Sequence, residues 1–397
     1  MIRILEKNKC CGCGACMQIC PIKCIQFIHD NEGFFYPKVI QEKCINCGLC
    51  EKVCPYTSIS DANKPLAIYA VKHIQEHIRL SSSSGGAFTA LAEFVISLGG
   101  YVFGARFDSA WNVVHWGTNQ IDGLDLLRRS KYVQSNTLNT YQEAKFLLNK
   151  GIWVLYCGTP CQILGLKKFL LKEYEHLILV DFVCHGVPST KTWHLFLSNQ
   201  TKEKIKNINF RDKKKGWRNY TLKIESDNQE YNYSIEDNVS SYMKGFLKEL
   251  YLRPSCHNCP AKSFRSGSDI TLADYWWIQE VRPEFNDNIG CSLVYVNSPK
   301  GEKLLEKINV IKQQTDDARD IKNGFLYSGA VSHSALAHKN RGLFFENVNS
   351  SNFSELVFTL VKDSWYKRIF SNTKRVLRKN NRIMTLYKKH IKSILRK

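Results

Sequence analysis

Two cysteine runs near the start of the chain have the clearest chemistry. Each reads C-x2-C-x2-C-x3-C-P, and the second run follows the first at an offset of 34 residues. The thiols are Cys10, Cys13, Cys16 and Cys20 in the first run and Cys44, Cys47, Cys50 and Cys54 in the second. Bacterial ferredoxins with two 4Fe-4S clusters have this spacing, and the last cysteine of each run ligates the other cluster. The pattern therefore predicts one cluster on Cys10, Cys13, Cys16 and Cys54 and another on Cys44, Cys47, Cys50 and Cys20.

The alternatives for these runs are a zinc site and a disulfide framework. Zinc sites use paired ligands with a longer gap between the pairs. Disulfides need an oxidising compartment, whereas residues 1–9 are polar and charged and do not resemble a secretory signal peptide. We therefore expect a cytoplasmic protein whose thiols serve as ligands. Cys11 and Cys24 fall outside the spacing, and we interpret them as small buried residues of the ferredoxin core.

A second set of thiols is spread over the middle of the chain. Cys157 and Cys161 enclose a Gly-Thr-Pro turn, Cys184 precedes His185, and Cys256 and Cys259 form a C-x2-C pair. The first turn is compatible with a redox dithiol, with a phosphate-binding helix start, or with plain burial. Cys184 and His185 have the residue types of a nucleophile and its base, although adjacent side chains usually point apart.

These later thiols also have the residue types of a metal site. Cys161 and Cys184 each follow a predicted strand, so we expect them at one edge of a sheet. Together with Cys256 and Cys259 they could hold a third cluster, hold zinc, or remain unligated, and spacing alone does not decide among these.

A small-residue loop, Ser81 to Gly86, precedes a predicted helix. Its glycines allow the backbone to approach a ligand closely, and the start of a helix favours an anion. Lys131, in the segment Ser-Lys-Tyr-Val-Gln-Ser, has no special role by local rules.

The elements that must position these residues alternate between strand and helix. We predict strands at 68–72, 101–107, 113–118, 152–156 and 177–183, with helices at 87–98, 141–149, 160–171 and 190–197. Further strands are predicted at 208–211, 220–225, 231–235, 269–273 and 291–297. This order predicts a sheet with parallel strands and helical cover. The predicted fold class is α+β: a two-cluster ferredoxin-like domain, then a mixed α/β domain, then a basic helical tail. The predicted domains are 1–60, 66–200, 201–345 and 364–397.

The net charge of +20 is partly concentrated at the end of the chain. Residues 364–397 contain twelve Lys or Arg and no Asp or Glu, and apolar residues recur there at seven-residue spacing. A basic amphipathic helix is typical of membrane-surface or partner binding. Packing against its own domain is the other reading of this tail. Nucleic acid is not expected, because no recognition motif accompanies the charge.

Together the motifs resemble one known family. The order of the ferredoxin pair, SSSGG, SKYVQS, CGTPCQ, CHGVPS, FRDKKKGW, RPSCxxCP, SDITLADYW and CSLVYVN is similar to that of the coenzyme F420 hydrogenase/dehydrogenase beta-subunit family. The resemblance covers about residues 1–345. It is strongest to the bacterial branch with a fused ferredoxin domain, which is often met beside polysaccharide-biosynthesis genes.

The resemblance implies FAD beside iron–sulfur clusters. It places the flavin near Ser83, Ser84, Gly85, Gly86, Lys131, Thr159 and Pro160, and it favours a third 4Fe-4S cluster on Cys161, Cys184, Cys256 and Cys259. The implied function is an oxidoreductase that passes electrons between the clusters and a flavin-linked hydride donor or acceptor, of the coenzyme F420 type or another small molecule. Its partner would be an external electron carrier or redox protein. The alternative is a non-enzymatic electron-transfer or docking subunit.

Overall fold

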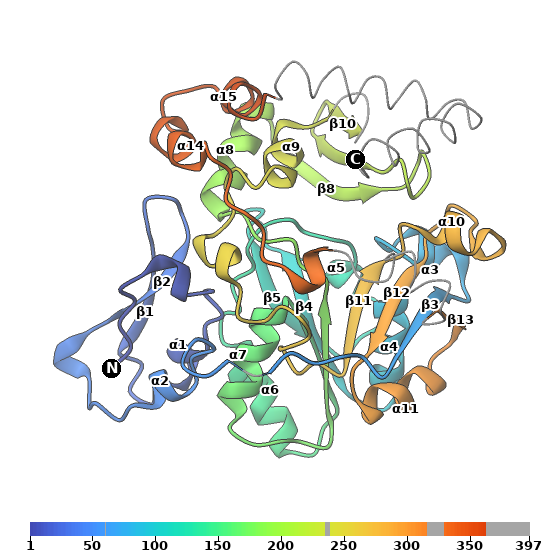
Figure 1. Cartoon of the computed structure of the whole chain (residues 1–397), viewed down its shortest axis with the longest axis horizontal. Helices are drawn as coiled ribbons and strands as arrows, with labels where there is room; N and C mark the ends of the chain where they lie inside the picture. The colour runs from blue at the N-terminus through green and yellow to red at the C-terminus, as the bar shows by residue number, and fades with distance from the viewer. Residues whose placement is uncertain (60, 235–238, 316–328, 363–397) are drawn as a thin grey trace, which may run out of the picture.

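The computed structural model of the chain describes residues 1–59, 61–234, 239–315 and 329–362. Figure 1 shows three parts: a small N-terminal unit, a central layer built on a large sheet, and a third layer beyond one edge of that sheet. This mixed α/β architecture behind an N-terminal ferredoxin-like unit confirms the predicted fold class. The predicted basic helix at 364–397 lies outside the described residues. Within the described part of the chain, no helix is both long enough and apolar enough to span a bilayer.

The N-terminal unit is small and is built around the two cysteine runs. It contains α1 (Ala15–Ile19), α2 (Leu49–Lys52), the antiparallel strands β1 (Ile25–His29) and β2 (Phe35–Val39), and the short 3₁₀ turns η1 (Lys7–Lys9) and η2 (Gln41–Lys43). Each α-helix begins after a glycine in the left-handed conformation, with φ of 84° at Gly14 and 74° at Gly48. Residues with a Cβ are strained there, so glycine at this point lets each cysteine run turn sharply into its helix.

The central layer is an eight-stranded sheet in the order β13-β3-β12-β11-β7-β6-β4-β5. Its strands are β3 (Ala67–His73), β4 (Tyr101–Phe107), β5 (Val113–Thr118), β6 (Val154–Gly158), β7 (Leu177–Phe182), β11 (Ile270–Asp274), β12 (Ser292–Val296) and β13 (Val310–Gln314). Strands β4, β6, β7 and β11 are parallel. Strand β3 shares their direction, because it is antiparallel to β12, which is antiparallel to β11. Five strands therefore end at the same edge, the edge at which open α/β sheets bind ligands.

Helices cover both faces of this sheet (Figure 1). Helices α4 (Ala87–Ser97) and α11 (Pro299–Lys307) share one core with Leu155, Ile178 and Val180, and α5 (Leu124–Leu127) adds to it. Helices α6 (Thr140–Asn149) and α7 (Pro160–Leu170) share the opposite core with Tyr156 and Leu179. Neighbouring residues of one strand thus enter different cores, as the alternation of side chains along a strand requires.

The third layer lies beyond the carboxyl edge of the sheet. It combines the three-stranded sheet β10-β9-β8 with four helices: β8 (Ile205–Asp212), β9 (Thr221–Ser226), β10 (Glu230–Ser234), α8 (Thr190–Gln200), α9 (Ser241–Leu247), α14 (Arg341–Asn347) and α15 (Phe353–Leu360). Its core is aromatic, with Trp193, Tyr242 and Tyr251 fully buried. The remaining short elements are α3 (Glu76–Leu80), η3 (Pro254–Asn258), α10 (Ile278–Val281), η4 (Pro283–Phe285) and α13 (Gly329–Ser332).

The strands and helices predicted between residues 68 and 297 are all present, with ends that differ by no more than three residues. The strands predicted at 101–107 and 113–118 pair with each other as antiparallel β4 and β5. Strands β1, β2 and β13 and helices α9, α11, α14 and α15 were not predicted. Strands β11, β12 and β13, from the predicted 201–345 region, lie in the same sheet as strands from the 66–200 region. The predicted domain limits themselves stay predictions.

Candidate functional site

One group of thiols lines a cavity in the outer part of the N-terminal unit. Its members, the second ferredoxin group, are Cys20, Cys44, Cys47 and Cys50. Three come from the second cysteine run and one from the first, as the ferredoxin spacing predicts. Cys47 is exposed, whereas Cys50 is buried and its sulfur accepts a hydrogen bond from the Ile2 amide at 3.3 Å. Such an N–H to sulfur contact is typical of the shell around an iron–sulfur cluster.

A second group lies deeper, toward the central sheet. Its members, the first ferredoxin group, are Cys10, Cys13, Cys16 and Cys54. Burial raises the pKa of Cys16, and the negative charges of Cys10 and Cys54 raise it further. Burial also raises the pKa of Cys54, again with a contribution from Cys10. These mutual effects show that the last cysteine of the second run lies among the thiols of the first.

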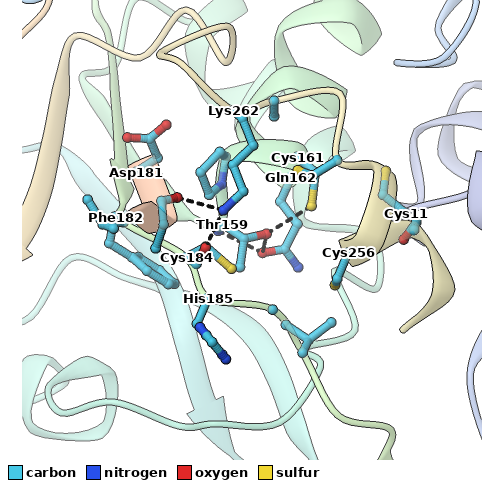
Figure 2. Close-up of a pocket in the computed structure, with 18 of the residues that line it drawn as sticks. Cys11, Thr159, Cys161, Gln162, Asp181, Phe182, Cys184, His185, Cys256 and Lys262 are labelled. Carbon is cyan, nitrogen blue, oxygen red and sulfur yellow. Dashed lines mark hydrogen bonds between the residues drawn. The ribbon is translucent and has the colours of Figure 1, made fainter. Parts of the chain in front are cut away.

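A third group lines a cavity of about 60 Å³ inside the molecule (Figure 2). Its members, the interior thiol group, are Cys161, Cys184, Cys256 and Cys259. These are the four thiols expected to come together on the strength of the family resemblance. They are separated by up to 98 residues along the chain, so only the tertiary fold brings them to one cavity.

Three segments of the chain position the interior thiol group. Cys161 lies in the first turn of α7, where Thr159 and Gln162 form a reciprocal capping box that fixes the start of the helix. Cys184 follows the end of β7, and Cys256 lies in η3. The loops after β7 and before η3 approach closely: a Cβ built on Gly186, whose φ is +150°, would meet the Leu252 side chain at 2.7 Å.

The four interior thiols are half-buried, and a buried cation, Lys262, lies beside them. Burial raises the pKa of Cys256 to about 12 and that of Cys259 to about 11, so both are neutral as free thiols at pH 7. A bound metal would deprotonate them, because metals bind the thiolate form. The Lys262 ammonium donates to the carbonyl oxygens of Cys184 at 2.7 Å and Ala330 at 2.6 Å (Figure 2). This positive charge beside the cavity would partly balance the charge of thiolates.

His185 has a different environment from its neighbour Cys184. Its Nε2 lies 3.3 Å from a carboxylate oxygen of Glu249, and its ring meets the Phe246 ring edge to face at 5.1 Å. Figure 2 shows the imidazole pointing away from the cysteine sulfurs. The arrangement therefore lacks the contact that a nucleophile and its base require.

Cys11 connects the ferredoxin unit to the interior cavity. It is buried, as predicted, but it also lines the cavity (Figure 2). Its thiol is close enough to those of Cys13 and Cys161 to interact with both: the Cys13 thiol and burial raise the pKa of Cys11, whereas the Cys161 thiol lowers it. The interpretation of Cys11 as a plain core residue therefore misses a role, since one residue joins the first ferredoxin group to the interior thiol group. Cys24, also buried, lies 3.5 Å from the sulfur of Cys20 and lines the second ferredoxin group's cavity.

The ferredoxin unit is docked firmly on helices α6 and α7. The Thr137 hydroxyl donates to the Cys13 carbonyl at 3.0 Å, and the Gln18 side chain accepts from the Tyr141 amide at 2.9 Å. A Cβ built on Gly165 in α7 would meet both Cβ and Sγ of Cys13 at 2.8 Å. A glycine at this helix position thus allows the first ferredoxin group to lie directly on the α/β domain.

The residues predicted to bind flavin lie in two places. Ser83, Ser84, Gly85 and Gly86 follow β3, whereas Thr159 and Pro160 line the interior cavity. The Ser83 hydroxyl accepts from the Ser130 amide at 2.7 Å, and the Ser84 hydroxyl donates to the Cys291 carbonyl at 2.8 Å. Gly86 has a φ of +85°, which permits the turn into α4.

Lys131 holds the end of α5. Its ammonium donates to four carbonyl oxygens, those of Leu126, Leu127, Arg128 and Arg129, at 2.6 to 3.3 Å. Burial lowers the pKa of Lys131 to about 7, with a smaller contribution from Arg129. The four carbonyls favour the charged ammonium, so Lys131 here serves the backbone of this turn.

Several buried polar residues near the carboxyl edge were not predicted from the sequence. Arg211 pairs with Asp274 at 3.0 Å and lies 3.9 Å from the centre of the Tyr220 ring. Lys213 donates to the carbonyls of Arg79, Ser84 and Ile289, each at 2.8 Å. Both cations bridge the third layer to the Ser81–Gly86 loop. No local pattern marks them, since their partners are distant in sequence.

The thiols of each group are not drawn together as closely as the ligands of a closed metal site. Among the described residues, no three His, Cys, Asp or Glu side chains converge closely enough to form a closed metal site. The grouping of the thiols rests on the cavities they share and on their mutual electrostatic effects. The donor set fits iron–sulfur clusters, which are held by four cysteine thiolates each.

Comparisons with known proteins give matches to two family models and to a solved structure. Residues 152–319 match the model for the C-terminal region of the coenzyme F420 hydrogenase/dehydrogenase beta subunit, and residues 9–58 match a 4Fe-4S dicluster domain. A similar solved structure is a chain of the F420-reducing NiFe hydrogenase complex from Methanosarcina barkeri, at 17% identity and a TM-score of 0.46 over 68% of this chain and 92% of that one. No curated protein sequence matches. Residues 152–319 of the chain thus match the C-terminal region of the coenzyme F420 hydrogenase/dehydrogenase beta subunit, and a 4Fe-4S dicluster domain precedes this region.

Proposed function

We propose that this protein is an iron–sulfur flavoprotein oxidoreductase. It would pass electrons between an external carrier and a flavin-linked hydride donor or acceptor bound at the α/β domain. The observation that carries the proposal is the row of three thiol groups from the exposed Cys47 to the interior cavity, with Cys11 between the last two. A row of redox centres leading inward is of use only if something at its inner end accepts or supplies electrons.

The ligands of the first two clusters follow from the groups described above. The first ferredoxin group holds one cluster, and the second ferredoxin group holds the other. Cys24 stays outside both ligand sets because it falls outside the ferredoxin spacing, and its thiol lies 3.5 Å from the sulfur of the ligand Cys20.

The interior thiol group holds a third 4Fe-4S cluster in this proposal. Four thiols line one cavity, and the buried Lys262 offsets their charge. Zinc on the same four thiols is the competing assignment. The position of the cavity favours the cluster, because Cys11 lines it and interacts electrostatically with Cys161 on this side and with Cys13 of the first ferredoxin group on the other. A zinc ion has no redox chemistry, so the row of redox centres would stop at the first ferredoxin group.

Electrons enter or leave at the second ferredoxin group. Among the described cysteines, Cys47 alone is exposed, and the apolar side chains of Ile22 and Ile45 beside it are 39% and 63% exposed. A partner redox protein that docks there would come closest to a cluster.

FAD, when bound, exchanges electron pairs with a hydride carrier and single electrons with the clusters. We place it along the carboxyl edge of the sheet, from the Ser83–Gly86 backbone toward Thr159 and Pro160. The segment from Ser130 to Ser135 runs between these two places, because Ser130 contacts Ser83 and the Ser135 carbonyl accepts from Gln162 at 3.1 Å. The hydride carrier would be a deazaflavin of the coenzyme F420 type or another small molecule.

The direct test is anaerobic purification with iron, zinc and flavin quantified on the same sample. We expect about twelve irons and one FAD per chain, since each cluster contains four irons. About eight irons and one zinc per chain would show that the interior thiol group binds zinc and not a third cluster. About eight irons with no flavin, after FAD has been supplied during purification, would overturn the flavoenzyme. Reduction of the clusters by reduced coenzyme F420, compared with NADH, then tests the hydride carrier.

A further inference from the structure

Arg253 is a fully buried cation that lies next to thiols. Its side chain has no exposed surface, although it carries a full positive charge. It follows β-bridge residue Leu252 and precedes η3, so the same loop that supplies Cys256 also fixes Arg253. A buried charge without a counter-ion is strongly unfavourable.

The partners of Arg253 are neutral groups and one thiol. Its guanidinium donates to the carbonyls of Cys10 at 2.8 Å and Phe35 at 2.8 Å, to the Gln134 side chain at 3.0 Å, and to the Cys10 sulfur at 3.6 Å. It also lies 4.4 Å from the centre of the Tyr36 ring. Among the residues that the structure describes, no carboxylate pairs with it. Of these partners, the Cys10 thiol is the group that becomes an anion when a metal binds.

From this geometry we infer that Arg253 is the counter-charge of the first cluster and sets its reduction potential. An oxidised 4Fe-4S centre with its four thiolates carries two negative charges, and one added electron makes three. A fixed cation that donates to a ligand sulfur stabilises the more negative state more strongly, so it raises the potential. Arg253 thus acts through Cys10, as a positioning and electrostatic residue.

A second consequence concerns the direction of the row. Arg253 also lines the interior cavity, but the cysteine with which it hydrogen-bonds is Cys10 and not one of the interior thiols. The second ferredoxin group has no arginine contact among the hydrogen bonds of the described residues. The first cluster is therefore expected to have a higher potential than the second, which makes it the better resting place for an electron inside the protein.

The inference rests only on the dicluster half of the proposed function, and an EPR-monitored redox titration of the purified full-length protein tests it. In Arg253→Gln, we expect one ferredoxin-type cluster to titrate at a lower potential than in the wild type, with iron content unchanged. Arg253→Lys keeps the charge, so its cluster should titrate close to the wild-type potential. Arg341→Gln is the matched control: Arg341 also joins the ferredoxin unit to the rest of the chain, by pairing with Glu32, and contacts no thiol among the described residues. This control should leave every potential unchanged.

The wild-type protein provides a test that does not depend on a variant folding. In protein labelled with ¹⁵N-arginine, pulsed EPR of the reduced first cluster should detect a nitrogen coupling that Arg253→Lys lacks. Unchanged potentials in Arg253→Gln at full iron content would overturn the inference. If Arg253→Gln loses its iron, absence of the arginine coupling in the wild type would overturn it. Wild-type protein without iron would instead refute the dicluster assignment itself.

Discussion

The outer and inner thiol groups of this protein are built in opposite ways. The second ferredoxin group comes from one segment of 50 residues and ends at the surface with Cys47. The interior thiol group is assembled from the first turn of α7, the segment after β7 and the η3 region, and its four thiols are half-buried. Local spacing can specify the first arrangement, whereas the second needs a completed sheet. A site made from one segment can be recognised in isolation, and a site made from several segments can be recognised only in the fold.

The two regions also differ in their charge environment. The interior cavity has the buried Lys262 and Arg253 at its wall. The outer cavity is lined mainly by apolar residues and cysteines, together with Asn46 and Met1, whose amino terminus pairs with Glu51 at 3.2 Å. Buried cations stabilise added negative charge, and an exposed cluster obtains that stabilisation from water instead. The inner end of the row is thus expected to hold electrons and the outer end to exchange them.

The largest expected effect separates the two regions by metal content. Cys256→Ala should lower the iron content from about twelve to about eight atoms per chain and leave both ferredoxin-type EPR signals in place, because it removes one ligand of the interior cluster only. Cys291→Ala is the control, since Cys291 is a buried thiol that lies in none of the three groups. If Cys256→Ala and Cys291→Ala contain equal amounts of iron, the interior thiol group does not hold a cluster.

The second prediction uses pH to probe the desolvated edge beside the interior cavity. Burial lowers the pKa of His115 to about 4, and the imidazole forms a hydrogen bond with Ser135 at 2.6 Å. The unfolded chain, with an ordinary histidine pKa near 6.5, binds more protons between these values, so lowering the pH favours unfolding. When the pH is lowered from 7 to 5, protonation of this residue in the unfolded chain should decrease the free energy of unfolding by about 2 kcal/mol. His115→Gln should lose that slope in anaerobic denaturant titrations, and equal slopes in the two proteins would contradict the prediction.

The third prediction concerns the contact that joins the regions. Gly165→Leu places a side chain where Cys13 lies, and overpacking of this kind costs about 1–3 kcal/mol. We expect a lower free energy of unfolding and faster proteolysis between the ferredoxin unit and the α/β domain. Gly342→Leu in α14 is the control, because a Cβ there meets nothing within 4 Å. If both substitutions have the same effect, the ferredoxin unit does not depend on close contact with α7.

The smallest expected effect is at the start of α7. Thr159→Ala removes the capping box and should lower the free energy of unfolding by about 1 kcal/mol. Because this cap orients the turn that contains Cys161, iron should be released from the interior site faster when a chelator is added. Ser298→Ala removes the cap of α11, which lies in a different core from α7, and should cost similar stability without changing iron release. If Thr159→Ala and Ser298→Ala release iron at equal rates, the cap of α7 does not influence the interior site.

Much of the fold was predictable because its patterns are local. Strands β3 to β9 and helix α4 were readable from apolar runs and glycine stops, and the repeated spacing is the basis of the two proposed ferredoxin ligand sets. Helices α14 and α15 were missed because their burial depends on partners distant in sequence, and strand β13 because it is an edge strand without a buried residue. Cys11 shows the same limit within the site: its position inside a ligand loop indicates burial, but nothing local indicates Cys161 as its neighbour.

By itself the sequence determined that this protein has a dicluster ferredoxin unit, because a ligand loop needs only correctly spaced cysteines and glycines that can turn. It also determined that Cys161 and Cys184 follow strands, since an apolar run ends shortly before each of them. Only the tertiary structure decided that Cys161, Cys184, Cys256 and Cys259 line one cavity, that Cys11 reaches it, and that the buried Arg253 lies against Cys10. Strand order and the docking of one unit on another set these neighbours, and both are determined by packing across the whole chain.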